Sequence, residues 1–338
     1  MTPQPAPFSS LAPANSMILG EHSVVYGYPA IACALEQWMT IKWQPISAPA
    51  TKKNWLQIDS TLGQFSGSVT WLLEQQEFRF IAEAVDYFLQ TQPKPSSGFH
   101  WKLEVKSEFS STIGLGSSAA VLSATLVGLD HIFKTHFSLT ELFAIGHQII
   151  LKIQQRGSGT DLAASLLGGI LYFQPKSQTQ AIAEPEFKKL PIALPTLLVY
   201  SGYKTPTAKV LEMVAENWQH RPIELADLYQ RMGQVTKTAF SSLQAQQMSS
   251  FYQACQHYQQ LMDELGVNDE ILASLIRTLS DCPQIHVAKI SGSGLGDCVL
   301  GLGTLSECPK TQQALHNYQQ LQLDISPRGS HIQLESAL

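Results

Sequence analysis

Residues 110–120 read SSTIGLGSSAA and place Gly114 and Gly116 directly ahead of two serines and an apolar run. Glycine allows positive φ angles and a close approach of the backbone to a ligand. Serine is a good helix N-cap, and the free N–H groups at a helix start attract anions. The stretch therefore predicts a glycine loop that leads into a helix and suits a polyphosphate. A tight turn with an ordinary cap fits the same residues.

The bulk composition limits the classes of protein. A chain of 338 residues exceeds one typical core, so two domains are expected in a compact fold with 44% hydrophobic residues. Charged residues make up 14%, against a usual share of about 25%, and the net charge is −5. Because no strong Lys/Arg cluster is present, we expect no nucleic-acid partner.

The N-terminal segment and the cysteines bear on location. Residues 1–13 lack the basic and apolar regions of a signal peptide, and no run of about 18 apolar residues exists. We therefore expect a cytoplasmic protein that does not contact a membrane. An odd cysteine count without a C-x-x-C pair favours reduced, buried thiols over a disulfide framework or a zinc site. The cysteines are Cys33, Cys255, Cys282, Cys298 and Cys308.

Hydrophobic periodicity predicts both strands and helices. The polar, proline-containing stretch 177–195 is the expected domain boundary, giving domains 1–185 and 186–338. Residues 1–16 are predicted as a partly ordered lead-in, and residues 44–53 as a loop. Strands are predicted within 17–35 and at 38–43, 100–105, 168–173, 197–200, 285–290, 297–302 and 331–334. Helices are predicted at 69–89, 117–133, 139–154, 161–167, 207–218, 223–243, 249–265, 270–280 and 311–321. Ser138 and Glu141 form a capping box for the helix at 139–154.

A second polar segment, RGSGTD at 156–161, places Asp161 beside a Gly-Ser-Gly turn. A carboxylate there can orient a hydroxyl group or accept its proton. An acidic residue favoured by the dipole of a helix start is the alternative.

A third segment, KISGSGLGDC at 289–298, has three glycines in five residues between two apolar strands. It indicates a backbone that approaches a ligand closely, and an ordinary hairpin loop fits it too. Because the G-x-G-x-x-G match is imperfect and no crossover helix follows, a Rossmann site is not expected. The chain also lacks the Gly-Lys dipeptide of a Walker A loop.

Together these segments resemble the GHMP kinase family, and within it the mevalonate kinases first and the phosphomevalonate kinases second. Residues 12–27, with Gly20-Glu21-His22, resemble the first family motif. Residues 113–120 are similar to the second motif, the ATP phosphate loop, and residues 289–298 to the third. Three motifs in the family's order, across nearly the whole chain, make the resemblance specific.

The resemblance implies a two-domain α/β (α+β) fold. Its N-terminal domain would be S5-like with a left-handed βαβ unit, its C-terminal domain would be ferredoxin-like, and ATP and Mg²⁺ would lie between them. It implies that Asp161 is catalytic and that Ser118 contacts Mg²⁺. The implied nucleotide contacts are Ile113, Gly114, Leu115, Gly116, Ser117, Ser118 and Ala119. The implied substrate contacts are Glu21, His22, Ser158, Gly159, Gly292, Ser293 and Gly294.

Some positions depart from the family pattern. Asn15 stands where a lysine is usual, and Ile150 where mevalonate kinases carry a Mg²⁺-binding glutamate. Ser110 replaces a common proline, and residues 157–165 and 296–298 look more like phosphomevalonate kinase.

The function expected from the resemblance is ATP-dependent phosphorylation of a primary hydroxyl on a small carboxylate, with mevalonate as the first candidate. Phosphomevalonate kinase is the second candidate, and a nucleotide-binding regulatory protein without turnover is the third. Arg156, Lys204 and Lys289 are the candidate contacts for a substrate anion or the transferring phosphate. The small-molecule substrate is the expected partner, and a homodimer is left open.

Overall fold

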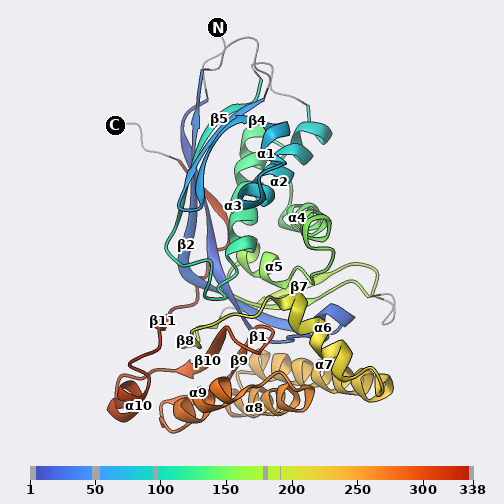
Figure 1. Ribbon diagram of the computed structural model, residues 1–338, viewed down its shortest axis with the longest axis vertical. Coiled ribbons are helices and arrows are strands. Elements are labelled where there is room, and N and C mark those ends of the chain that lie inside the picture. Colours follow the sequence, from blue (N-terminus) through green and yellow to red (C-terminus); the bar gives the residue numbers. More distant parts are fainter. Residues whose placement is uncertain (1–4, 48–53, 94–97, 178–181, 191, 335–338) are drawn as a thin grey trace.

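Two β-sheets organise the computed structural model, which describes residues 5–47, 54–93, 98–177, 182–190 and 192–334 (Figure 1). The end of the loop predicted at 44–53 lies outside the described residues. No helix in the described ranges combines the length and apolar character needed to cross a bilayer.

The first sheet has the order β12-β1-β2-β5-β3-β4, and β6 and β7 extend it beside β2. Only the β3–β5 pair is parallel among the pairings of this sheet's described strands. Its strands are β1 (Phe8–Leu19), β2 (Ala30–Pro45), β3 (Trp55–Ser60), β4 (Gly63–Ser68), β5 (His100–Ser107), β6 (Ile170–Gln174), β7 (Glu186–Leu190) and β12 (His331–Leu334).

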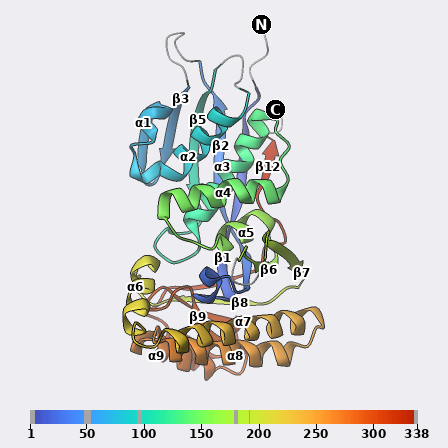
Figure 2. The same cartoon turned by 90° about the vertical axis from the view of Figure 1, so that its right-hand side faces the viewer.

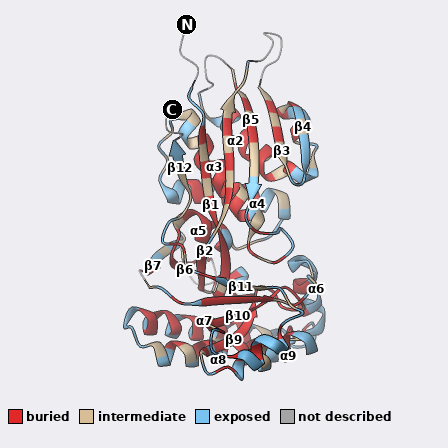
Figure 3. Ribbon diagram, turned by 90° about the vertical axis from the view of Figure 1, so that its left-hand side faces the viewer, coloured by how far each residue is buried: buried red, intermediate tan, exposed pale blue. Residues whose placement is uncertain are grey.

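Helices cover one face of this sheet (Figures 1 and 2). They are α1 (Val69–Leu72), α2 (Arg79–Thr91), α3 (Ser117–Phe133), α4 (Leu139–Gln154) and α5 (Thr160–Leu167), and the short turns η1 (Ser23–Tyr26) and η2 (Gln76–Phe78) accompany them. From the opposite side, the strands lie in front of the helices (Figure 3). The alternating burial along β5 fits a sheet with one covered face. The predicted capping box at Ser138 and Glu141 is confirmed.

Several of the sequence predictions for the first ninety residues are wrong. The predicted lead-in contains most of β1, and Pro13 is accommodated because the β1–β2 register shifts between Pro13 and Ala14. The strands predicted at 30–35 and 38–43 form one strand, β2. Burial explains the misreading, because Ala30–Leu35 is buried throughout whereas Met39, Ile41 and Trp43 alternate with more exposed residues.

Two further corrections concern the helices predicted at 69–89 and at 311–321. The predicted helix at 69–89 is divided into α1, η2 and α2, and a β3–β4 hairpin precedes it. The predicted helix at 311–321 ends at Ala314, and residues Gln320–Leu323 pair instead with the edge of the second sheet.

The second sheet has the antiparallel order β11-β8-β10-β9. Its strands are β8 (Thr196–Tyr200), β9 (Ile285–Ser291), β10 (Cys298–Gly303) and β11 (Gln320–Leu323). Its helices are α6 (Thr207–Asn217), α7 (Pro222–Gln244), α8 (Met248–Leu265), α9 (Glu270–Ser280) and α10 (Pro309–Ala314). Helices α7, α8 and α9 lie below this sheet in Figure 1. The β-α-β-β-α-β order is ferredoxin-like, as the resemblance implied.

The sheets divide the chain differently from the predicted domains. β7 begins at Glu186 and pairs with β6, and β12 pairs with β1, so residues from both sides of position 185 share the first sheet. The chain therefore passes from the first sheet to the second after β7 and returns to the first at β12. The predicted domains 1–185 and 186–338 stay a prediction.

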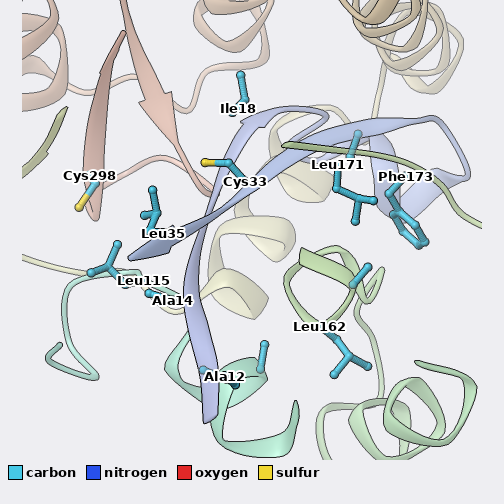
Figure 4. Packing of buried hydrophobic residues seen from close by; sticks show 14 of the residues in the cluster. Ala12, Ala14, Ile18, Cys33, Leu35, Leu115, Leu162, Leu171, Phe173 and Cys298 are labelled. Atoms are coloured by element: carbon cyan, nitrogen blue, oxygen red, sulfur yellow. The ribbon is translucent and has the colours of Figure 1, made fainter. Parts of the chain in front are cut away.

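One cluster of buried hydrophobic side chains extends from the first sheet to the second. Figure 4 shows Ile18 of β1 and Cys33 and Leu35 of β2 on the same side of the long hairpin as Cys298 of β10. Leu115 of the glycine loop lies beside Ala14 in the same view. The glycine loop is therefore anchored in a core that both sheets share.

The cysteine prediction is only partly right. Cys282 and Cys308 form a disulfide, which joins the end of α9 to the start of α10. Cys33, Cys255 and Cys298 are free and buried, as predicted. Burial raises the pKa of each of these three thiols to about 12.

We expect Gly128→Ala to destabilise the fold although alanine favours helix. A Cβ at Gly128 of α3 would lie 2.6 Å from the Trp43 ring, whose Nε1–H donates to Ser10 Oγ. Overpacking of this kind costs about 1–3 kcal/mol. Urea unfolding measures the loss, and Trp43→Phe provides the control background. A cost that does not shrink in that smaller-ring background would contradict the steric cause.

Candidate active site

The glycine loop leads into α3 as the sequence predicts. Gly114 and Gly116 have φ angles of 72° and 67°, and Gly116 is the N-cap of α3. Neighbouring segments also approach both positions closely. A Cβ at Gly114 would lie 2.7 Å from Asp297 Oδ1, and one at Gly116 would overlap the Asn15 amide. Glycine is thus required here both by backbone conformation and by space.

Two cavities meet at the start of α3. The central cavity, of about 580 Å³, lies between the glycine loop, α5, α6 and the loop before β10. The side cavity, of about 530 Å³, extends from α3 towards α2, β5 and the turn between β3 and β4. Ser117 and Ser118 line both cavities, and so do Arg79, Phe80 and Ser111. An elongated ligand can therefore cross the N-terminus of α3 from one cavity into the other.

Most predicted site residues line the central cavity. They are Glu21, His22, Gly114, Gly116, Ser117, Ser118, Ala119, Ser158, Gly159, Asp161, Gly292 and Ser293. Ile113 and Leu115 are buried in the core behind the described lining, and Gly294 packs against Val267. The fold thus brings the three sequence motifs to one cavity.

Asp161 lies in the first turn of α5 and is open to the central cavity. Ser158 stabilises this turn, because its Oγ accepts a hydrogen bond from the Thr160 backbone N–H at 3.2 Å. The surrounding protein desolvates the Asp161 carboxyl and raises its pKa. Lys204 opposes this effect, and Asp297 adds to it. A carboxylate with a raised pKa is suited to accept a proton from a bound hydroxyl group.

Glu21 and Lys289 form a fully buried ion pair, with 2.5 Å between Lys289 Nζ and Glu21 Oε1. The pair joins the turn after β1 to strand β9, and the Tyr258 hydroxyl donates to the Glu21 carbonyl oxygen at 2.7 Å. Burial raises the pKa of Glu21, and Lys289 only partly offsets this. Lys289 is absent from the described cavity lining, so its prediction as a contact for a substrate anion is wrong.

His22 is buried beside this pair and has a φ angle of 60°. Its Nε2 lies 2.8 Å from the Ser293 carbonyl oxygen. Because that oxygen can only accept, Nε2 carries the proton and Nδ1 has the free lone pair. Burial lowers the pKa of His22, which favours the neutral ring. This hydrogen bond ties the first motif to the third.

Two of the departures from the family pattern, Asn15 and Ile150, have structural explanations. Asn15 Nδ2 donates to Ser165 Oγ at 2.9 Å, and the Asn15 backbone N–H donates to the Leu115 carbonyl oxygen at 3.2 Å. Asn15 therefore links β1, the glycine loop and α5. Ile150 of α4 contributes an apolar wall next to Gly157. Neither position supplies a charge to the cavity.

The structure adds Asp297 and Arg79 to the candidate residues. Asp297 is buried against the glycine loop, and Arg79 lines both cavities. In the sequence, Gly296-Asp297-Cys298 belongs to the third glycine-rich segment, but the pattern assigns no role to the Asp297 carboxylate. Arg79 lies outside the three motifs, so the sequence alone gives no sign that it reaches the site.

Two of the predicted cations, Lys204 and Arg156, line the central cavity. Arg156 also lies 3.8 Å from Glu212.

Oxygen donors for a metal also meet here. Within the described residues, no group of three or more His, Cys, Asp and Glu side chains could hold a metal by itself. The Ser118 hydroxyl and the carboxylates of Asp161 and Asp297 face the same cavity. Mg²⁺ is commonly bound by one or two carboxylates together with substrate phosphates, and this donor set fits that pattern.

Comparison with known proteins agrees with the fold and the motifs. Residues 79–169 match the GHMP kinases N terminal domain. The chain superposes on the Lin0012 protein from Listeria innocua with a TM-score of 0.82 at 19% identity, covering 98% of this chain and 100% of that one. The resemblance to the GHMP kinase family that the motifs carry is therefore confirmed.

The chain is similar to mevalonate kinases in sequence and in fold. The mevalonate kinase of Pyrococcus furiosus is 27% identical, over 86% of this chain and 87% of that protein. The mevalonate kinase of L. major, solved in complex with R-mevalonate, has a TM-score of 0.73 at 19% identity, covering 95% of this chain and 96% of that one.

We expect Lys289→Met and Glu21→Gln each to destabilise the protein strongly. Each substitution leaves one buried polar or charged group without its partner, which costs about 3–5 kcal/mol. The double variant should lose less than the sum, because no unpaired charge remains. Urea unfolding of the four proteins measures the coupling, and strictly additive losses would show that the two side chains do not depend on each other.

Proposed function

We propose that the protein transfers the γ-phosphoryl group of ATP to the hydroxyl group of mevalonate, giving 5-phosphomevalonate for isoprenoid precursor synthesis. The observation that carries the proposal is the meeting of two cavities at the N-terminus of α3, with Asp161 on the central-cavity side. The similarity to mevalonate kinases supports this choice of acceptor.

The nucleotide would lie across the start of α3. The backbone N–H groups of the loop and the helix dipole favour phosphates at this position. The side cavity would then take the nucleoside, and the γ-phosphate would point into the central cavity. Ile113 and Leu115 would serve this arrangement by anchoring the loop in the core, while Gly114, Gly116, Ser117, Ser118 and Ala119 contact the phosphates.

Mg²⁺ would be held by the Ser118 hydroxyl, by the nucleotide phosphates and by a cavity carboxylate. When bound, it neutralises phosphate charge. The acceptor would occupy the central cavity. Most of the predicted substrate contacts line this cavity, namely Glu21, His22, Ser158, Gly159, Gly292 and Ser293. Gly294 would support them from the loop behind the lining.

Asp161 would orient the acceptor hydroxyl and take its proton. The hydroxyl oxygen forms a bond to the γ-phosphorus as the bond from that phosphorus to the β,γ-bridging oxygen breaks. ADP leaves with the electron pair, and the proton passes to the Asp161 carboxylate. Catalysis of this kind depends mainly on positioning and on charge stabilisation.

Phosphomevalonate kinase is the second candidate, because three cationic side chains, Arg79, Arg156 and Lys204, line the central cavity. A phosphorylated acceptor would make use of them.

ADP release should be fastest with mevalonate in a panel that also contains 5-phosphomevalonate, homoserine and galactose. A coupled assay measures the release, and calorimetry measures ATP binding separately. A preference for 5-phosphomevalonate would replace the first candidate with the second. Intact ATP binding without turnover on any acceptor would favour a regulatory protein.

We expect Asp161→Asn to lower turnover about 10²–10⁴-fold, since it removes the proton acceptor. ATP affinity should change little. Asp281→Asn, at the exposed end of α9, removes the same charge away from the cavity and is the matched control. Full turnover in Asp161→Asn would exclude Asp161 as the base.

The pH profile of kcat/KM tests the same assignment. The base must be ionised, and the pKa of Asp161 is raised above the ordinary value of 3.8. Activity should therefore fall, as the pH decreases, through a value above that of an ordinary aspartate. An acid limb at or below the ordinary aspartate value would contradict the role of this carboxyl.

A further inference from the structure

Lys204 and Asp297 form an ion pair at the edge of the glycine loop. Lys204 Nζ lies 3.5 Å from Asp297 Oδ1, and both side chains line the central cavity. The Asp297 side chain is 9% exposed and that of Lys204 is 38% exposed. The aspartate is thus fixed in the wall, whereas the lysine is open to a ligand.

The backbone holds this pair in place. The Asp297 N–H donates to the Tyr203 carbonyl oxygen at 2.9 Å, and the Ser201 N–H donates to the Asp297 carbonyl oxygen at 2.9 Å. Thr205 Oγ1 donates to the Leu295 carbonyl oxygen at 2.6 Å. The segment that carries Lys204 is therefore bonded along its length to the loop that carries Asp297.

The same pair lies beside the phosphate-binding position and the base. A Cβ at Gly114 would touch the Asp297 carboxylate, which places that carboxylate against the glycine loop. Lys204 also acts electrostatically on Asp161 and partly offsets the rise in its pKa that burial causes. Lys204 thus lies within electrostatic range of both the loop and the base.

Phosphate bound in this cavity would require a cationic side chain to balance its charge and that of the nearby carboxylates. Asn15 and Ile150 are neutral, while Asp161 and Asp297 bring two carboxylates to the place where phosphate charge would collect. Arg156 interacts with Glu212 at 3.8 Å, on the exposed rim. Arg79 belongs to α2, where its guanidinium lies over the Phe80 ring at 5.7 Å. Of these cations, only Lys204 has both Asp161 and Asp297 as electrostatic partners in the described residues.

We propose that Lys204 is a catalytic residue that contacts the transferring phosphoryl group, and that Asp297 is the positioning residue that holds it there. The inference rests on the proposed phosphoryl transfer but not on the identity of the acceptor. Lys204 donates hydrogen bonds to the phosphoryl oxygens while the bond to the acceptor forms and the bond to ADP breaks. In this chain, the cation comes from the segment before α6 and not from position 15.

The test compares Lys204→Met and Lys204→Arg with Lys209→Met. Lys209 is an exposed lysine of α6 outside the described cavity lining, so it matches the charge change. We expect Lys204→Met to lower kcat about 10²–10³-fold, as for the loss of one transition-state donor. KM for ATP should change little, and Lys204→Arg should recover at least about tenfold of the loss because it retains the charge. A kcat for Lys204→Met no lower than that of Lys209→Met would overturn the proposal.

A binding experiment gives a readout that needs no acceptor. Calorimetry with ADP and Mg²⁺, with and without aluminium fluoride as a mimic of the transferring group, should show tighter binding with the fluoride in the wild type. Lys204→Met should lose this gain and keep its affinity for ADP alone. Retention of the full gain would overturn the contact. If mevalonate proves to be the wrong acceptor, this result still stands, so the two proposals can fail separately.

The role of Asp297 is tested by a double-mutant cycle. Asp297→Asn should lower kcat, with less effect in the Lys204→Met background, because both substitutions act through one group. Independent losses would show that Asp297 does not act through Lys204. Thermal unfolding of each variant checks folding, and the Lys204 variants test the contact even if Asp297→Asn is unstable.

Discussion

The buried ion pair between Glu21 and Lys289 is the constraint on which the site depends. Removing two charges from water is costly, so the pair persists only where the geometry around it is fixed. Here it fixes the turn after β1 against β9. Ser16 and Ser291 share a hydrogen bond at 2.8 Å in the same region. The first and third motifs, 268 residues apart at the ion pair, are thereby held as one wall of the cavity.

The position of the glycine loop is also fixed by hydrogen bonds to β1 and β10. Cys298 Sγ donates to the Ile113 carbonyl oxygen at 3.1 Å, and Asn15 bonds to the Leu115 carbonyl oxygen. The loop therefore contacts both the first strand of one sheet and the third strand of the other. Residues with little apparent chemistry, such as Asn15, set the position of the phosphate-binding backbone.

Much of this could be predicted from the sequence, because local patterns encode it. Helices α3 and α4 and the capping box follow from periodicity and from residue types at fixed offsets. The strand β1 could not be recognised so easily, because its Pro/Ala/Ser-rich residues gain their strand character from pairing with β2 and β12. The Cys282–Cys308 disulfide and the Lys204–Asp297 pair are also tertiary, since each joins segments that no local pattern connects.

The pairing of β12 with β1 has a consequence for how the molecule is made. The outer edge of β1 is covered by residues 331–334, so the first sheet lacks an edge strand until nearly the whole described chain has been synthesised. An uncovered strand edge can pair with other chains. The strands of the second sheet, which lie between β1 and β12 in sequence, are therefore synthesised before the first sheet can be completed. The first sheet thus begins with the earliest described strand and receives its last strand only at the end of the described chain.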